Sequence, residues 1–143
     1  MTEPKPPDPR VQTHLNALGL RFTVSDAGLF TVAFEVEGDR TQDVHIASAT
    51  TFIDQLEIRD VYSYGLSSET PLHADIANAL LAYNDAIRLG AWKLLRGDGD
   101  SCSAVFCIPI AANTTANALL FALETAVKHA DLMAERFIGE DCY

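Results

Sequence analysis

The side chains with metal-binding chemistry are spread over the sequence and form no ligand cluster. The four histidines fall on different predicted elements, and none has a second ligand at helical spacing: His14, His45, His73 and His129. We expect His129 to pair with Asp131 on a helix surface. Asp98-Gly99-Asp100 resembles the start of a calcium loop, but the ligand spacing is not continued and no glutamate closes it, so a hairpin turn is predicted there. We therefore expect no metal and no other cofactor.

Nucleophilic side chains also lack a catalytic setting. Ser63 and the pair Ser67-Ser68 have no Gly-x-Ser-x-Gly frame and no neighbouring residue that suggests a base. Cys102 and Cys107 are five residues apart on a predicted strand, so they point to opposite faces of the sheet and cannot share a metal. Together with Cys142 they make an odd number of cysteines, which we expect to be free thiols with packing roles. We predict that the protein is not an enzyme.

Length, composition and charge describe one acidic globular domain. The chain has 143 residues, of which 48% are hydrophobic, and this suffices for one core. A formal net charge of -10 opposes binding to nucleic acid or to an anionic membrane surface; it favours solubility or a partner with a basic segment. We find neither a secretory signal nor an apolar run long enough to span a bilayer, so we expect a cytoplasmic protein without membrane contact.

The first half of the chain is predicted to contain one helix followed by strands. A flexible, proline-rich leader is expected over residues 1–8, and a single domain over residues 9–143. Asp8 and Pro9 begin a helix, and Gly19 ends it. Alternating apolar residues predict strands in three segments: 22–24, 30–36 and 44–46.

The second half adds two helices and a further hairpin. The segment 48–68 predicts one more strand and a loop. A helix over residues 72–89 carries apolar side chains at helical spacing and is expected to be central to the core. Trp92 and the strand 102–110 form a hairpin, and a long last helix ends at Gly139. The order α-βββ(β)-α-ββ-α predicts an α+β fold in which an antiparallel sheet is packed with helices.

Local motifs within this order point to a known family. They are the helix end Leu18-Gly19-Leu20, the turn Asp26-Ala27-Gly28, the segment from Phe30 to Val36 and the small-residue segment Val61-Tyr62-Ser63-Tyr64-Gly65. The most specific motif is the aromatic-Asn pair Tyr83-Asn84 in the second helix. With these motifs the chain, from residue 11 to residue 137, resembles the YbjN family of small bacterial proteins. That family shares the type III secretion chaperone-like fold.

The resemblance to the YbjN family carries expectations about function. It implies a protein without known catalysis, described in the family as a sensory-transduction regulator or as chaperone-like, and it implies a homodimer. Secretion chaperones of this fold are similarly small and acidic, and they hold an extended segment of a client protein along their surfaces. A shared fold does not by itself transfer a function to this chain.

Several apolar residues are candidates for contact with a protein partner. The candidate protein-binding residues are Tyr62, Tyr64, Leu66, Trp92, Leu119 and Phe121. Core packing is the alternative for each of them. Leu119, Phe121 and Leu132 lie off the main apolar stripe of the last helix, as a dimer contact would require. Asn84 is predicted to tie its helix to a neighbouring strand, because a buried amide without partners costs about 1–3 kcal/mol.

Two functions follow from these observations. The first is a non-catalytic protein-binding module, chaperone-like or regulatory, that acts as a homodimer and binds a protein client or a regulatory partner. The alternative is a small-molecule-sensing regulatory domain or an enzyme, with a pocket between the second helix and the sheet, near Tyr83, Asn84 and Trp92.

Overall fold

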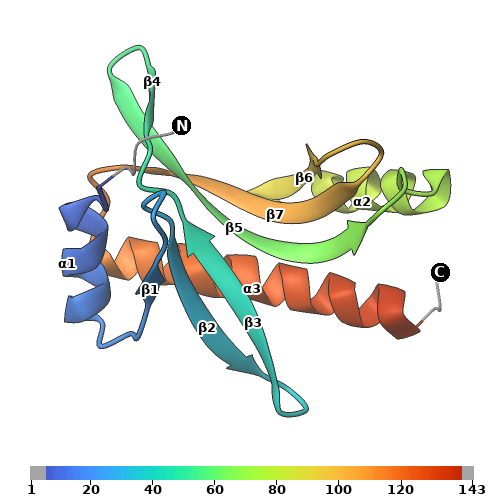
Figure 1. Ribbon diagram of the computed structural model, residues 1–143, viewed down its shortest axis with the longest axis horizontal. Coiled ribbons are helices and arrows are strands. Elements are labelled where there is room, and N and C mark those ends of the chain that lie inside the picture. The colour runs from blue at the N-terminus through green and yellow to red at the C-terminus, as the bar shows by residue number, and fades with distance from the viewer. Residues whose placement is uncertain (1–5, 140–143) are drawn as a thin grey trace.

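The computed structural model describes residues 6–139, with side chains as far as residue 133. Residues 1–5 of the predicted leader and Cys142 lie outside this range. The elements are α1 (Pro9–Ala17), β1 (Thr23–Val24), β2 (Phe30–Val36), β3 (Arg40–Ile46), β4 (Thr51–Ile53), β5 (Leu56–Ser68), α2 (Ala74–Asp85), β6 (Ala91–Arg96), β7 (Cys102–Ala111) and α3 (Ala116–Gly139). The strands form one antiparallel sheet in the order β1-β2-β3-β5-β7-β6, with β4 paired to β5 (Figure 1). The predicted α+β class is confirmed.

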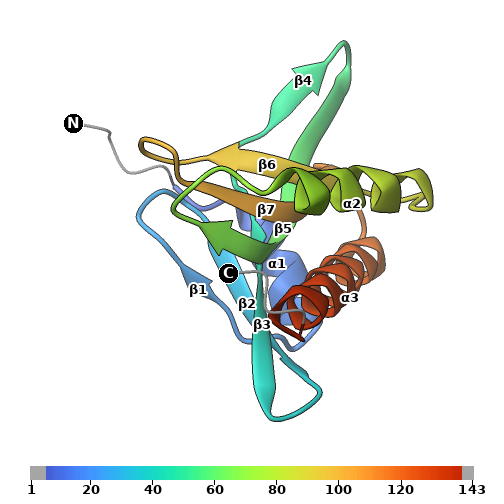
Figure 2. The same cartoon turned by 90° about the vertical axis from the view of Figure 1, so that its right-hand side faces the viewer.

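The hydrophobic core lies between one face of the sheet and the helices. Side chains alternate along each strand, and the residues that face the helices, such as Val61 on β5 and Phe106 and Ile108 on β7, are fully buried. Leu119 and Leu123 of α3 pack against them. The buried residues of α1 and α2 join the same cluster, so all three helices lie on one side of the sheet (Figure 2).

Helix α1 begins as predicted and is tied to the sheet by charged groups. A carboxylate oxygen of Asp8 accepts a hydrogen bond from the backbone N–H of Arg10. The same carboxylate pairs at 2.6 Å with the buried guanidinium of Arg59 on β5. Arg59 also donates to the carbonyl oxygens of Ala47 and Ser48. Hydrogen bonds from Arg10 and from Arg59 hold the pKa of Asp8 well below its usual range.

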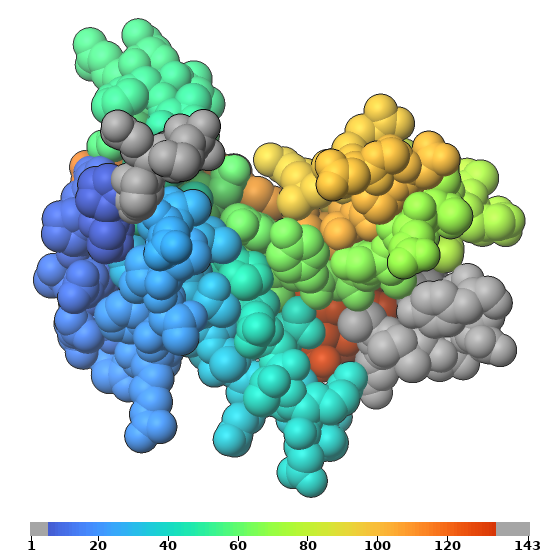
Figure 3. All heavy atoms as spheres, viewed as in Figure 1, coloured from blue at the N-terminus to red at the C-terminus, as the bar shows by residue number. Residues whose placement is uncertain are grey.

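The segment 48–68 contains two strands, β4 and β5, that form a hairpin. The sequence predicted only one strand and a loop here, so one strand was missed. Ile53 on β4 lies opposite Leu56 on β5, and Asp54 in the turn has a φ of 56°. A turn of this kind is usually marked by glycine or asparagine, which explains why the sequence pattern missed it. The hairpin stands out from the body of the molecule (Figure 3), and the side chains of Phe52, Ile53 and Leu56 are exposed.

Helix α2 is shorter and more peripheral than predicted. It begins after His73 and ends at Asp85 instead of residue 89. Leu80 is its buried residue, and the helix runs beside the edge strand β6. The prediction that this helix is central to the core is wrong, because α3 crosses β3, β5 and β7 and occupies that place.

The long last helix is confirmed. Helix α3 buries Leu123, Val127 and Ala130 of the predicted stripe, whereas the side chains of Ala134 and Phe137 lie outside the described part. Within residues 6–139, no helix combines the length and the apolar character needed to cross a membrane.

Candidate binding site between α2 and β6

Asn84, near the end of α2, bonds to the backbone of Trp92 on β6. Its Oδ1 accepts a hydrogen bond from the N–H of Trp92 at 2.7 Å, and its Nδ2 donates to the carbonyl oxygen of Trp92 at 3.3 Å. The predicted role of Asn84, an amide that ties its helix to a neighbouring strand, is confirmed. Both backbone groups of Trp92 therefore point away from β7, toward α2, because N–H and C=O of one strand residue point the same way.

The next outward residues of β6 leave the edge of the sheet open. Backbone direction alternates along a strand, so the N–H and C=O groups of Leu94 and Arg96 also point away from β7. Among the described residues, no group forms a hydrogen bond with these outward backbone groups. The side chain of Leu94 is 51% exposed. A free edge with exposed apolar side chains is a template for pairing with another strand.

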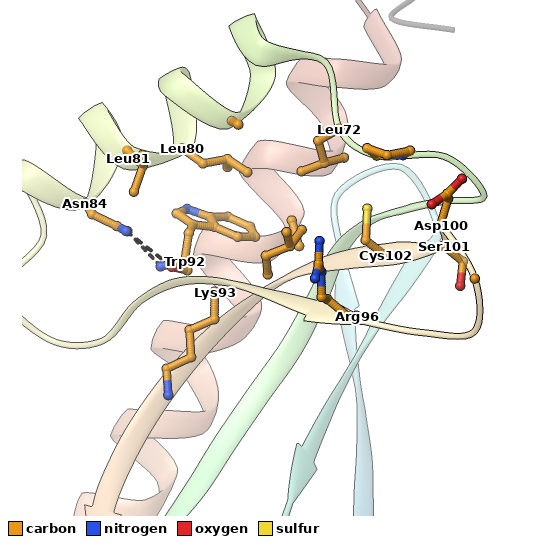
Figure 4. Close-up of a pocket in the computed structure, with 15 residues that line it drawn as sticks. Leu72, Leu80, Leu81, Asn84, Trp92, Lys93, Arg96, Asp100, Ser101 and Cys102 are labelled. Atoms are coloured by element: carbon orange, nitrogen blue, oxygen red, sulfur yellow. Dashed lines mark hydrogen bonds between the residues drawn. The ribbon is translucent and has the colours of Figure 1, made fainter.

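A pocket of about 340 Å³ lies between α2 and the helix-facing side of β6 and β7. Apolar side chains from α2 and the preceding loop form one wall, including Leu72, Leu80 and Leu81, and Trp92 forms part of the opposite wall (Figure 4). Leu94 on β6 also lines the pocket. The pocket predicted near Asn84 and Trp92 is therefore present. Tyr83 does not line it; its hydroxyl is hydrogen-bonded to Nδ1 of His129 on α3 at 2.9 Å.

Among the described residues, the buried polar side-chain atoms that line the pocket have hydrogen-bond partners, with one exception. The side-chain amide of Asn84 is hydrogen-bonded to the backbone of Trp92, and the thiol of Cys102 donates a hydrogen bond to the carbonyl oxygen of Thr70. The exception is the indole N–H of Trp92, a residue that is only 6% exposed: this donor is buried and has no hydrogen-bond partner among the residues that the structure describes. At the rim, Arg96 and Asp100 contribute one charge of each sign.

The opposite face of the sheet carries a cluster of aromatic side chains. His45 on β3 lies against Tyr62 and Tyr64 on β5, with ring centroids 5.2 and 5.6 Å from its own. Burial lowers the pKa of His45 and raises the pKa of Tyr62. Burial also raises the pKa of the Cys107 thiol, beside them on β7, to about 11. These directions leave His45 uncharged and the thiol unreactive near neutral pH, so the cluster offers no activated nucleophile.

The predicted protein-binding residues occupy three different environments. Tyr62 and Tyr64 lie on the face of the sheet that the helices do not cover. Leu66 and Trp92 face the helices, where Leu66 packs against the core. Phe121 on α3 is 63% exposed and remains available to a partner.

Leu119 was predicted to lie on the partner-binding surface of the last helix, but the structure places it elsewhere. Its side chain is 1% exposed and lies in the core, so it cannot contact a partner. The expectation that Leu119 lies off the buried stripe is wrong, because the sheet curves around α3 and the core uses a wider band of the helix. Phe121 and Leu132, eleven residues apart, stay exposed on one side of α3.

The histidines and cysteines play mainly structural roles. The imidazole of His129 stacks on Phe106 at 4.4 Å and bonds to Tyr83, so the predicted surface pair with Asp131 is wrong. Asp131 pairs instead with Arg40. Cys102 and Cys107 are buried free thiols on opposite faces of β7, as predicted. Within the described part of the chain, no three potential ligands lie together in a way that could hold a metal ion.

The residues that sequence reasoning missed are those whose role depends on tertiary placement. Leu72, Leu81, Leu94 and Arg96 line the pocket, yet they are separated by up to a full helix in the sequence. One local signal was available: Leu94 and Leu95 are adjacent apolar residues on a short strand next to lysine and arginine, which is typical of an exposed edge.

Comparison with known proteins supports the fold assignment. No protein-family model matches the sequence, and no curated protein matches it. The crystal structure of YbjN from E. coli, described as a candidate transcription regulator, is similar to this structure with a TM-score of 0.61. The two sequences are 14% identical, and the match covers 92% of this chain and 90% of that chain. The predicted resemblance is thereby confirmed at the level of structure: this chain has a YbjN-like fold.

Proposed function

We propose that this chain is a non-catalytic protein-binding module, chaperone-like or regulatory, that binds an extended segment of a partner protein along β6. The observation that carries the proposal is the open edge at Leu94 and Arg96 beside an apolar pocket. An extended segment can pair with such an edge through its backbone and place one side chain in a neighbouring pocket, and helix-flanked edge strands bind peptides in this way. The similar E. coli structure, a candidate regulator, is compatible with a binding role.

Asn84 sets one end of the proposed binding edge. Because its amide already occupies the outward groups of Trp92, an added strand can pair with Leu94 and Arg96 but cannot continue past Trp92. Main-chain pairing of this kind is independent of sequence, which suits a client held in an extended state. The pocket would then supply selectivity for one apolar side chain.

The charge of the chain favours a protein partner over direct contact with nucleic acid. The net charge of -10 repels a phosphate backbone. A regulatory role is therefore proposed to act through a protein, and a segment with basic residues outside the pocket would be attracted. We place this activity in the cytoplasm.

The proposed assembly is a homodimer in which two copies meet across α3. Phe121 and Leu132 form an exposed apolar pair on one side of this helix, three turns apart. We propose a second copy of the chain as the partner of this surface. Across a two-fold axis, the exposed pair on α3 of one copy would contact the same pair on the other copy, and most homodimers have this symmetry. The β6 edge lies elsewhere and stays free for the client.

A binding experiment with defined peptides tests the proposal. Short random peptides displayed on phage are selected against the immobilised full-length protein, and the enriched sequences are synthesised and titrated by fluorescence anisotropy. We expect binding in the micromolar range, with amide signals of β6 shifted in NMR spectra. Selection of no peptide, or shifts confined to other strands, would reject the β6 edge as the site.

Small-molecule sensing at the pocket is a second candidate function. It is favoured by the size of the pocket, about 340 Å³, and by its apolar lining, because ligand sites in proteins are concave, largely apolar and carry few polar groups.

A further inference from the structure

We infer that the pocket between α2 and β6 binds a compact, uncharged, apolar molecule that carries one hydrogen-bond acceptor, and that this acceptor pairs with the indole N–H of Trp92. The inference rests on the second candidate function, small-molecule sensing, and names its ligand class. It can fail separately from peptide binding, because the main-chain pairing proposed for a peptide uses backbone groups at the β6 edge and needs no ligand in the pocket.

The dimensions of the pocket fix the size of the ligand. Its volume of about 340 Å³ is near the lower end of ligand sites and corresponds to on the order of ten non-hydrogen atoms. Leu72, Leu80 and Leu81 on one side and Trp92 on the other give it apolar walls (Figure 4), and Leu94 also lines it. An aliphatic or aromatic body is therefore the part of the ligand that these walls contact.

The hydrogen-bonding groups of the pocket predict that the ligand carries a single hydrogen-bond acceptor. The amide of Asn84 and the thiol of Cys102 are both engaged with backbone groups. The indole N–H of Trp92 is the buried side-chain donor left without a partner among the described residues, and an indole can only donate. A buried donor without a partner is costly, so a ligand acceptor that reaches it gains affinity.

A ligand would approach the indole nitrogen past the exposed side of α2. In Figure 4 the nitrogen lies at the end of the ring toward Leu81 and Asn84, beneath the helix. Leu81 is 67% exposed, so its side chain can turn without disturbing the core. We therefore expect the ligand to reach the nitrogen by displacing the side chain of Leu81.

The charges around the pocket favour an uncharged ligand. Three charged residues line the pocket. Arg96 and Asp100 have opposite signs, and the side chain of Lys93 points away from the pocket (Figure 4), toward the face of the sheet that carries Cys107. The interior offers a neutral donor to the ligand and no charged group. Burying a carboxylate or an ammonium in such a site without an opposite charge is strongly unfavourable.

The test uses three probes with similar apolar bodies: hexyl methyl ketone, which carries an acceptor, octane, which carries none, and octanoate, which is charged. Trp92 is the single tryptophan of the chain, so its fluorescence and its indole N–H signal in NMR spectra both report on the pocket directly. We expect the ketone to shift the indole N–H signal in a saturable way and to bind about tenfold more tightly than octane, with no binding of octanoate.

A filling substitution and a matched control locate the site. Ala77→Leu on α2 reduces the pocket volume and is expected to abolish ketone binding, whereas Ala82→Leu, on the exposed side of the same helix, is expected to leave it unchanged. If Ala77→Leu does not fold, the indole signal of the unmodified protein still decides the question. Tight binding of octanoate, or equal binding of octane and ketone, overturns the ligand class but keeps the sensing function. Binding of none of the three overturns both and leaves the peptide proposal standing.

Discussion

The side chain of Asn84 is bonded to the backbone of Trp92 in the way that a neighbouring strand would be, with its Oδ1 accepting at 2.7 Å and its Nδ2 donating at 3.3 Å. This pair closes the edge of the sheet at Trp92 and leaves it open at Leu94 and Arg96. The same contact holds α2 over β6 and so forms one end of the pocket.

Loss of the Asn84 amide is expected to destabilise the protein. Asn84→Ala removes both hydrogen bonds and leaves the N–H and C=O of Trp92 unpaired beneath α2. We expect the free energy of unfolding to fall by about 2 kcal/mol, measured by urea denaturation. Asn78→Ala is the control, because Asn78 is exposed on the same helix and its replacement is expected to have little effect. Equal losses for the two variants would contradict the assigned role.

Two glycines with similar backbone conformations are expected to differ in tolerance to alanine. Gly19 and Gly90 have φ values of 70° and 85°, but an added Cβ meets nothing within 4 Å at Gly19 and lies 2.7 Å from Ile108 and 2.9 Å from the carbonyl oxygen of Cys107 at Gly90. Gly19→Ala should cost about 1 kcal/mol from its backbone conformation alone. Gly90→Ala should cost about 3 kcal/mol, because steric strain is added. Thermal unfolding of both variants measures the difference.

The ion pair between Asp8 and Arg59 is expected to make stability depend on acid pH. The pKa of Asp8 is lowered in the folded protein, so its contribution is present above the unfolded pKa of 3.8 and is lost as pH falls. Asp8→Asn keeps a helix-capping side chain but removes the charge, and we expect it to cost roughly 2 kcal/mol at neutral pH. Urea denaturation at a series of pH values should show this difference shrinking below about pH 4. A difference that is constant with pH would contradict the ion pair.

Disruption of the exposed pair on α3 is expected to separate the proposed dimer. Light scattering should give twice 15.5 kDa for the unmodified protein and 15.5 kDa for Phe121→Glu, because a buried charge opposes the contact. Leu81→Glu, which changes an equally exposed side chain on α2, should leave the dimer intact. A monomer for the unmodified protein would reject the homodimer.

Local chemistry allowed much of the fold to be predicted from the sequence. The cap formed by Asp8, the strand Phe30–Val36 and the turn around Gly99 depend on residues close in the sequence, and each lies where it was predicted. Asn84 was also predicted, because a polar amide on an apolar helix face requires partners.

The surface was harder to predict, because one irregularity changes which face a side chain occupies. Tyr62, Tyr64 and Leu66 occupy alternate positions in the sequence, and all three were predicted to contact a protein partner. However, the register of β5 against β7 shifts between Tyr64 and Leu66. The shift moves Leu66 to the face that the helices cover. Gly65 stands at this bulge, where an added Cβ would lie 2.5 Å from the ring of Trp92. Such a contact depends on tertiary packing and leaves no periodic signal in the sequence.

The most direct test of the account is a proline at the open edge. Leu94→Pro removes the outward N–H of Leu94 but leaves the pairing of β6 with β7 intact, and proline is tolerated on an edge strand at such a position. Leu94→Ala retains the N–H and removes only the side chain. The measurement is the affinity of both variants for a peptide selected against the unmodified protein. We expect Leu94→Pro to bind at least about tenfold more weakly than Leu94→Ala, while equal affinities in two folded variants would contradict strand addition along β6.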